Sequence, residues 1–433
     1  MKSPTRGATL TRKANGTVHP PESELIYDWN RAGGAVVPAR GTVELDDETL
    51  RDGLQSPSVR SPSIENKLAI LHLMEALGID SADIGLPGAG PHVEGAVERI
   101  AREIAGSRMR IRPNCAARTV EADILPIVRI SQRVGISIEV ACFIGSSPIR
   151  QYAEDWDLDR MLRLTENAVA LAVREGLPVM YVTEDTTRAH PEHIRRLYTA
   201  AMRAGATRVC VCDTVGHATP NGVRNLIRFV SGVVEEVNPA VRIDWHGHQD
   251  RGLGVTNALW ALEAGAHRVH GCGLGIGERV GNTPMDQLLV NLQLLGWIDR
   301  DLSKLNEYCS RISEATGVRI PDNYPIVGRD AFRTGTGVHA AAIVKARRKG
   351  DEWLADRVYS GVPASMVGRK QAIEVGPMSG LSNVQCWLET HGIEARPELV
   401  DAVFRRAKQS DQILSDEEIL AVVGSFAPAE AAP

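Results

Sequence analysis

The chain has 433 residues, with 49 Lys and Arg against 54 Asp and Glu, and its formal net charge is −5. This balance argues against binding to nucleic acid or to a membrane surface, because no excess of positive charge is available for phosphate groups. No apolar run reaches the roughly 18–20 residues that a membrane-spanning helix needs.

Residues 1–40 show no sustained periodicity and are expected to form an N-terminal extension. The first residues lack the apolar stretch of a secretory signal, and a transit peptide is the alternative because four basic residues precede the first acidic one. The seven cysteines are an odd number in a long chain and form no close-spaced framework, which indicates reduced thiols and a cytoplasmic location rather than a disulfide scaffold.

From residue 42 onward, short β-branched runs alternate with amphipathic stretches of helical length. Eight such units over about 250 residues predict an α/β fold, a (β/α)8 TIM barrel between residues 41 and 297. The count of eight disfavours the alternative, an open doubly wound sheet. The strands are expected at residues 42–46, 82–86, 109–113, 137–143, 179–183, 208–212, 241–245 and 268–272.

Residues 298–433 predict a mostly helical C-terminal region, with helices at 302–315 and 397–408. The segment 328–379 is rich in Gly, Arg and Lys and is interpreted as a lid or a small subdomain. Residues 427–433 have the low complexity of a tail.

The active site of a TIM barrel lies at the carboxyl ends of its strands, so polar residues that follow each strand are the candidates. Arg51 and Asp52 follow the first strand and can pair a metal ligand with a cation for a developing oxyanion; a solvated charged turn is the alternative. Glu184 follows the fifth strand and is a candidate general base, whereas Asp185 is more typical of a helix cap. Thr214 follows the sixth strand and can orient water or a ligand, although a plain βα turn explains it equally well.

His246 and His248 give the strongest signal in the sequence. Residues two apart on a strand point to the same side, and Gly247 between them leaves room for both rings. Two imidazoles at the end of a barrel strand predict a metal pair, which Asp52 completes. Such a site suits a divalent cation (Zn, Mn, Fe, Co or Mg) that binds a 2-oxo acid through its carbonyl and carboxylate.

The segment 47–55 reads Asp-x-Thr-Leu-Arg-Asp-Gly-x-Gln, and with His246-x-His248 it resembles the DRE-TIM metallolyase superfamily. Within it, the sequence is most similar to the 2-isopropylmalate, homocitrate and citramalate synthases. Segments 213–220, 261–266 and 277–282 add to the resemblance, which covers about residues 42–380. The family implies a Claisen-type condensation, in which acetyl-CoA and a 2-oxo acid give a 2-substituted malate and free CoA.

The resemblance implies roles for individual residues. Arg51 would hold the carbonyl oxygen, and Glu184 would take part in deprotonating the acetyl methyl. His339 resembles a residue that reaches the active site of a neighbouring subunit and assists thioester hydrolysis, which implies a homodimer; a surface histidine on a lid is the alternative. The implied metal ligands are Asp52, His246, His248 and Asn282.

Three departures from the family pattern bear on regulation and substrate. We expect no room in this chain for the C-terminal domain with which many isopropylmalate synthases sense leucine. The run 376–380 is Gly-Pro-Met-Ser-Gly, where relatives often have Gly-Lys-His-Ser-Gly, and two cations are lost. In the segment 145–151, the residue after Ile149 is Arg150, where a histidine is common.

The third departure suggests a 2-oxo acid with a second anionic group, because Arg can bind an oxyanion in a bidentate way. Homocitrate synthases and the phosphono- and phosphinomethylmalate synthases use such acids. A helix-opening loop with an exposed Arg is the alternative, and a branched 2-oxo acid stays open. The candidate substrate-binding residues are Gln55, Ser146, Ser147, Arg150 and Thr214.

Other functions fit the same residues less well. A lyase of the same superfamily would cleave a 3-hydroxyacyl-CoA with the same metal ligands. A biotin-dependent carboxyltransferase would need a carrier partner, to which nothing in the sequence points. A catalytically silent metal-binding barrel is disfavoured because Arg51 and Glu184 accompany the metal ligands.

Overall fold

The computed structural model describes residues 20–426, so the possible transit segment within residues 1–19 and the tail at 427–433 lie outside the described residues. The chain divides into two compact units. One unit, Val36–Ile320, contains the barrel, and the other contains the rest of the described chain. No helix within residues 20–426 combines the length and apolarity needed to cross a membrane.

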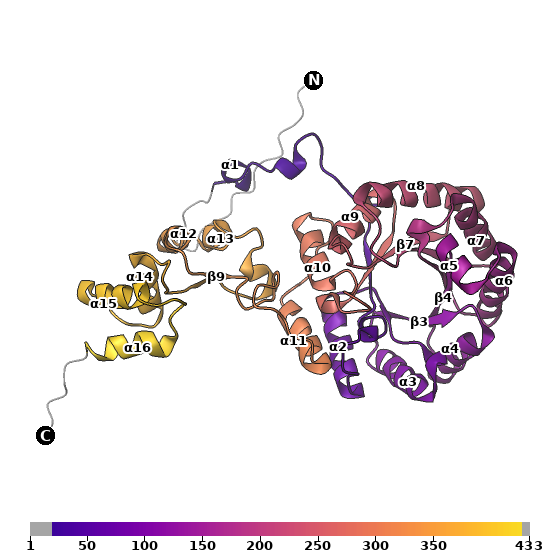
Figure 1. The fold of residues 1–433 in the computed structure, drawn as a ribbon, viewed down its shortest axis with the longest axis horizontal. Coiled ribbons are helices and arrows are strands. Elements are labelled where there is room, and N and C mark those ends of the chain that lie inside the picture. Colours follow the sequence, from indigo (N-terminus) through magenta and orange to yellow (C-terminus); the bar gives the residue numbers. More distant parts are fainter. Residues whose placement is uncertain (1–19, 427–433) are drawn as a thin grey trace. The chain divides into compact units, whose positions relative to one another are not determined.

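The parallel strands of this unit form a closed barrel (Figure 1). The eight strands follow one another in chain order, and β1 is hydrogen-bonded to both β2 and β8. The predicted TIM barrel is therefore confirmed. The strands are β1 (Glu44–Asp47), β2 (Ser81–Asp83), β3 (Arg112–Arg118), β4 (Glu139–Gly145), β5 (Val179–Glu184), β6 (Arg208–Asp213), β7 (Arg242–Gly247) and β8 (Arg268–Gly271).

Helices surround the strands and bury one apolar face against them (Figure 1). Side-chain caps fix where several begin: Ser63 accepts from the Asn66 amide at the start of α2, and Thr219 caps α8. Helix α11 follows residue 297 and packs on α2. The helices of this unit are α2 (Ile64–Ala76), α3 (Pro91–Gly106), α4 (Glu121–Val134), α5 (Pro148–Glu154), α6 (Leu158–Arg174), α7 (Pro191–Arg203), α8 (Pro220–Val237), α9 (Gly254–Ala264), α10 (Met285–Leu294) and α11 (Leu305–Thr316).

Two strand predictions need correction. Strand β3 begins at Arg112 and not at 109, because the Met109 amide donates to the Ile104 carbonyl and the Ile111 amide donates to Glu75. Strand β2 ends early because the Gly85 amide turns to the Asp83 carboxylate. In both places the backbone donor finds a partner outside the sheet.

The amino end of the barrel interior, called the floor here, is filled by charged side chains. The first residues of β1, β4, β6 and β8 are Glu44, Glu139, Arg208 and Arg268, and Asp244 of β7 joins them. Arg268 donates to Asp244 and to Glu139, both at 2.7 Å, and Arg208 donates to Asp244 at 2.8 Å and also to Glu44. The floor is thus held by mutually compensating charges.

The C-terminal unit is mostly helical, as predicted, and has its own buried apolar cores. A two-stranded parallel sheet, β9 (Arg333–Thr334) with β10 (Ala372–Ile373), lies in the segment interpreted as a lid. The helices are α1 (Glu22–Leu25), α12 (Gly337–Arg348), α13 (Glu352–Arg357), α14 (Leu381–Thr390), α15 (Pro397–Lys408) and α16 (Asp416–Gly424).

Candidate active site

A cavity of about 280 Å³ lies inside the carboxyl ends of the barrel strands, called the mouth here. Its two sides differ in chemistry. The polar side comes from β5, β7 and β8 and from the loops that follow β1, β6, β7 and β8. The opposite wall is apolar and comes from β3 to β6. The apolar wall consists of Ala116, Ala141, Phe143, Met180, Val182, Cys210 and Cys212.

Asp52, His246 and His248 converge at the mouth. The Asp52 Oδ2 atom lies 3.8 Å from His246 Nε2 and 3.9 Å from His248 Nε2. These separations are too long for hydrogen bonds, but they fit ligands that share one cation. The chain thus brings together the carboxylate and the two imidazoles that the sequence predicts as metal ligands.

Three buried polar atoms at the mouth have no hydrogen-bond partner among the described residues: Asp52 Oδ2, His248 Nδ1 and the Asn282 amide oxygen. Asn282 pairs with His248 across an isolated bridge, and its amide nitrogen donates to Cys272 and to the Ile276 carbonyl. Burying such atoms without partners is costly, so they favour a bound ligand at the mouth. The donor set, oxygen with imidazole nitrogen, fits a divalent transition metal.

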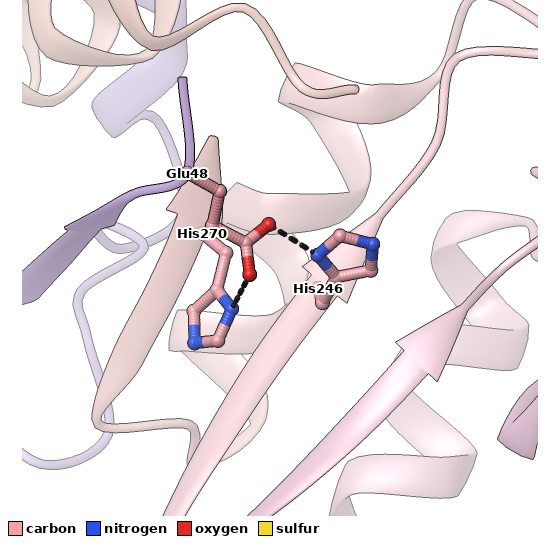
Figure 2. Close-up of side chains that lie close together, drawn as sticks. All are labelled: Glu48, His246 and His270. Atoms are coloured by element: carbon pink, nitrogen blue, oxygen red, sulfur yellow. Dashed lines mark hydrogen bonds and ion pairs between the residues drawn. The ribbon is translucent and has the colours of Figure 1, made fainter. Parts of the chain in front are cut away.

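Glu48 lies behind the triad and was not among the predicted site residues. Its carboxylate accepts from His246 Nδ1 at 2.7 Å (Figure 2). Nε2 of that ring is therefore free to face Asp52, 3.8 Å away. Its other oxygen lies 3.0 Å from His270 Nδ1. Burial lowers the pKa of His246, but Glu48 raises it by more, to about 9.

Arg51 is held at the edge of the cavity by acidic neighbours. Its Nε donates to Asp83 at 2.6 Å and one terminal nitrogen donates to Asp52 at 2.7 Å. Glu48 lies 3.5 Å from the other terminal nitrogen. Burial raises the pKa of Asp83 to about 7, although Arg51 acts against this rise. The guanidinium is therefore fixed, and it lines the cavity beside the triad.

Glu184 ends β5 and lines the same cavity. Burial raises the pKa of its carboxyl group, although Arg150 and Arg51 partly oppose the rise. A carboxylate with a raised pKa is a stronger base. The neighbouring Asp185 forms a bidentate pair with Arg188, which is a structural contact.

The predicted substrate-binding residues fall into two groups. Gln55 and Thr214 line the cavity. The Ser146 hydroxyl instead donates to the Glu184 carbonyl, and the Ser147 hydroxyl accepts from the Arg150 amide at the start of α5. Neither serine lines the cavity.

Arg150 faces a second cavity of about 430 Å³ that shares Glu184 and Thr214 with the first. Its guanidinium pairs with Glu154 at 2.9 Å and lies 4.0 Å from Glu184. His339 lies on α12 in the C-terminal unit, where its exposed ring stacks on Tyr359.

Four residues near the triad carried no assigned role at the sequence level: Glu48, Asp83, His270 and Arg279. Alternation along the strands could have found two of them, because Glu48 shares the inward face with Glu44, and His270 shares it with Arg268. Arg279 braces the mouth by donating to Asp250 at 2.8 Å and to the Thr214 carbonyl at 2.7 Å. Only the folded chain reveals that contact.

Comparison with known proteins identifies the family. Residues 42–311 match the family described as HMGL-like. The probable 2-isopropylmalate synthase of Methanopyrus kandleri is 34% identical over 373 residues, which are 85% of this chain and 69% of that protein. Homocitrate synthase AksA of the same organism is 32% identical over 84% of this chain and 86% of that protein. This chain therefore belongs to the HMGL-like, or DRE-TIM, family, as the motifs indicated.

A solved structure supports the fold. The HMG-CoA lyase of Bacillus subtilis superposes with a TM-score of 0.55 at 20% identity, and the match covers 66% of this chain and 97% of that chain. The putative (R)-citramalate synthase CimA of Methanopyrus kandleri is 30% identical over 92% of this chain and 71% of that protein. In sequence, the chain is thus more similar to these named synthases than to the lyase.

Proposed function

We propose that this chain condenses acetyl-CoA with a 2-oxo acid, giving a 2-substituted malate and free CoA. The observation that carries the proposal is that one cavity contains the triad of Asp52, His246 and His248, the fixed guanidinium of Arg51 and the buried carboxyl group of Glu184. The relatives named as 2-isopropylmalate and homocitrate synthases support the same reaction class.

In this proposal, Asp52, His246 and His248 hold a divalent cation, and Asn282 is available as a further oxygen donor. The unpartnered atoms on Asp52, His248 and Asn282 support that assignment. When bound, the cation supplies Lewis acidity to the carbonyl group of the 2-oxo acid. Zn, Mn, Co and Mg all accept nitrogen and oxygen ligands of this kind.

Glu184 takes a proton from the acetyl methyl group, and the resulting carbanion forms a carbon–carbon bond with the carbonyl carbon of the 2-oxo acid. Arg51 donates hydrogen bonds to the oxygen that gains negative charge. Water then attacks the thioester carbonyl, the carbon–sulfur bond breaks, and the CoA thiol leaves with a proton. We place His339 of a neighbouring subunit in this last step, so that a homodimer forms the complete site.

The walls of the cavity bear on the substrate side chain. Seven apolar or weakly polar residues face the triad, which favours an apolar substituent on the 2-oxo acid. A second anionic group could reach Arg150 only through the adjoining cavity. We therefore propose an apolar 2-oxo acid as the first substrate to test and a diacid as the second. The enzyme is placed in the cytoplasm, where its cysteines, all buried free thiols, stay reduced.

The test is thiol release from acetyl-CoA with 2-oxoisovalerate, pyruvate, 2-oxoglutarate, phosphonopyruvate and phosphinopyruvate, before and after chelation. We expect metal-dependent release with one acid and none with Asp52→Ala. Activity with a diacid or a phosphorus acid that Arg150→Met abolishes would move the substrate to the adjoining cavity. If no acid causes thiol release and the protein releases acetyl-CoA from a 3-hydroxyacyl-CoA, the proposed activity is wrong and the protein is a lyase.

A further inference from the structure

His270 is a buried histidine to which the proposed reaction assigns no role. It is 1% exposed and lies on the inward face of β8, one layer below the triad. Figure 2 shows its ring and that of His246 on the two oxygens of Glu48, at 3.0 and 2.7 Å. The carboxylate is therefore shared between a proposed metal ligand and a histidine outside the ligand set.

His270 is itself held from the other side. Its Nε2 lies 3.3 Å from the Asp244 carboxylate, which Arg208 and Arg268 fix at 2.8 and 2.7 Å. A ring that is protonated on both nitrogens donates to both carboxylates. A continuous chain of contacts thus runs from the floor through Asp244, His270 and Glu48 to His246.

This chain of contacts has a consequence for the metal site. An imidazole that donates its Nδ1–H to a carboxylate presents the Nε2 lone pair to a cation, and the donor bond fixes the plane of the ring. Glu48 can hold His246 in that way only while its own orientation is fixed. Arg51 lies 3.5 Å from Glu48 and offers a competing direction for the carboxylate.

We propose that His270 is a positioning residue for the metal site: it fixes the Glu48 carboxylate, which in turn fixes the tautomer and orientation of His246. In this role His270 acts through Glu48 and is not itself a ligand of the cation, although its ring also lines the cavity. The inference rests on the metal assignment made under the proposed function.

A second cation is the competing explanation, because Glu48, His246 and His270 offer atoms that all lie within 4.8 Å of one another. The distances argue against it. At 2.7 and 3.0 Å, the two nitrogens lie within direct hydrogen-bonding distance of the carboxylate, which leaves no space for an ion along either contact.

Two substitutions test the contacts of the two His270 ring nitrogens one at a time. In His270→Asn, the amide nitrogen replaces Nδ1 and keeps the bond to Glu48. In His270→Gln, the amide reaches toward Asp244 and loses Glu48. His267→Gln is the matched control, because His267 directly precedes β8 and its ring accepts from the Ile243 amide instead of contacting Glu48. Co²⁺ affinity and stoichiometry are measured by spectroscopic titration of each metal-free protein.

We expect His270→Gln to weaken Co²⁺ binding about 10–100-fold, the usual effect of losing a contact that orients a ligand. His270→Asn should restore most of the affinity, and His267→Gln should bind like the parent. Equal affinity of His270→Gln and the parent would overturn the inference, and two cations per chain in the parent would do so as well. Should His270→Gln fail to fold, Glu48→Gln supplies the same test, since its amide can accept from only one ring.

Failure of the metal assignment and failure of the positioning role give different results. A parent protein that binds no Co²⁺, or that binds it equally well after Asp52→Ala, contradicts the metal assignment itself. If the parent binds one ion through Asp52 and His270→Gln binds it equally well, only the positioning role is contradicted.

Discussion

The two ends of the barrel interior are both built from buried ionisable groups, but they satisfy them differently. At the floor, Arg208 and Arg268 pair with Asp244, Glu44 and Glu139. Burial raises the pKa of Asp244, yet the two guanidinium groups lower it by more, far below its ordinary value. At the mouth, by contrast, three buried polar atoms lack partners among residues 20–426.

The difference separates a structural end from a functional one. A buried charge that is fully paired holds the strands together and has nothing left to offer a ligand. A buried polar atom without a partner pays a desolvation cost that a ligand can recover. Substitutions at the floor should therefore act on stability, whereas substitutions at the mouth should act on catalysis.

The largest expected effect is at the floor. Arg268→Leu leaves Asp244 and Glu139 without their central partner, and removal of one partner of a buried pair costs about 3–5 kcal/mol. Urea unfolding of the metal-free protein measures the loss. Arg102→Leu is the control, because this exposed Arg pairs with Glu98 on the surface of α3 and such pairs contribute about 0–1 kcal/mol. Equal losses in the two variants would mean that the floor charges are not structural.

At the mouth, Arg51→Ala should lower kcat about 10²–10³-fold, or roughly 2.7–4 kcal/mol in the transition state, because a donor to the developing oxyanion is lost. Stability should change little, since Asp83, whose pKa is already raised to about 7, can become protonated. Steady-state kinetics and metal analysis are the measurements. Full activity of this variant would refute the role given to Arg51.

Asp47, the last residue of β1, lies in a third environment, where it faces Tyr308 of α11. It accepts from the Thr49 amide and from Tyr308 at 2.5 Å, and burial raises its pKa from 3.8 to about 7. The folded state therefore binds this proton more tightly than the unfolded state, so its contribution to stability is complete below pH 4 and falls as the pH rises to 7. Its slope is at most about 1.4 kcal/mol per pH unit.

Asp47→Asn should remove that slope, because the amide keeps its shape but does not titrate. Unfolding free energies of both proteins at about pH 4.5, 5.5 and 6.5, in roughly even steps across this window, give the comparison. Parallel pH profiles would show that Asp47 stays ionised in the folded protein.

The smallest expected effect concerns Ser147, which the sequence suggested as a substrate ligand. Because its hydroxyl caps α5, Ser147→Ala should cost about 0.5–2 kcal/mol of stability and leave the KM for the 2-oxo acid unchanged. A raised KM with unchanged stability would show that Ser147 binds the substrate and is not a structural cap.

Much of this protein follows from local patterns. The alternation of strand and helix sufficed for the barrel, and the spacing of His246 and His248 sufficed to place both rings on one side. The end of β2 and the start of β3 could not be predicted in this way, because the Asp83 and Glu75 carboxylates accept hydrogen bonds from backbone amides that would otherwise be available to the sheet. The partners of Arg150 and Ser147 did not follow either, since a loop of that composition suits a cap and an anion site equally well.

The sequence by itself determined the fold class, because periodicity is a local property, and its motifs at residues 47–55 and 246–248 indicated the family by resemblance. It also predicted the end of the barrel at which we propose the chemistry. Only the tertiary structure decided which buried groups are paired. Glu48 and His270 are 222 residues apart in sequence, and the register of β1 against β8 brings them within hydrogen-bonding distance. Closure of the barrel joins its first and last strands, and no pattern within either strand contains that contact.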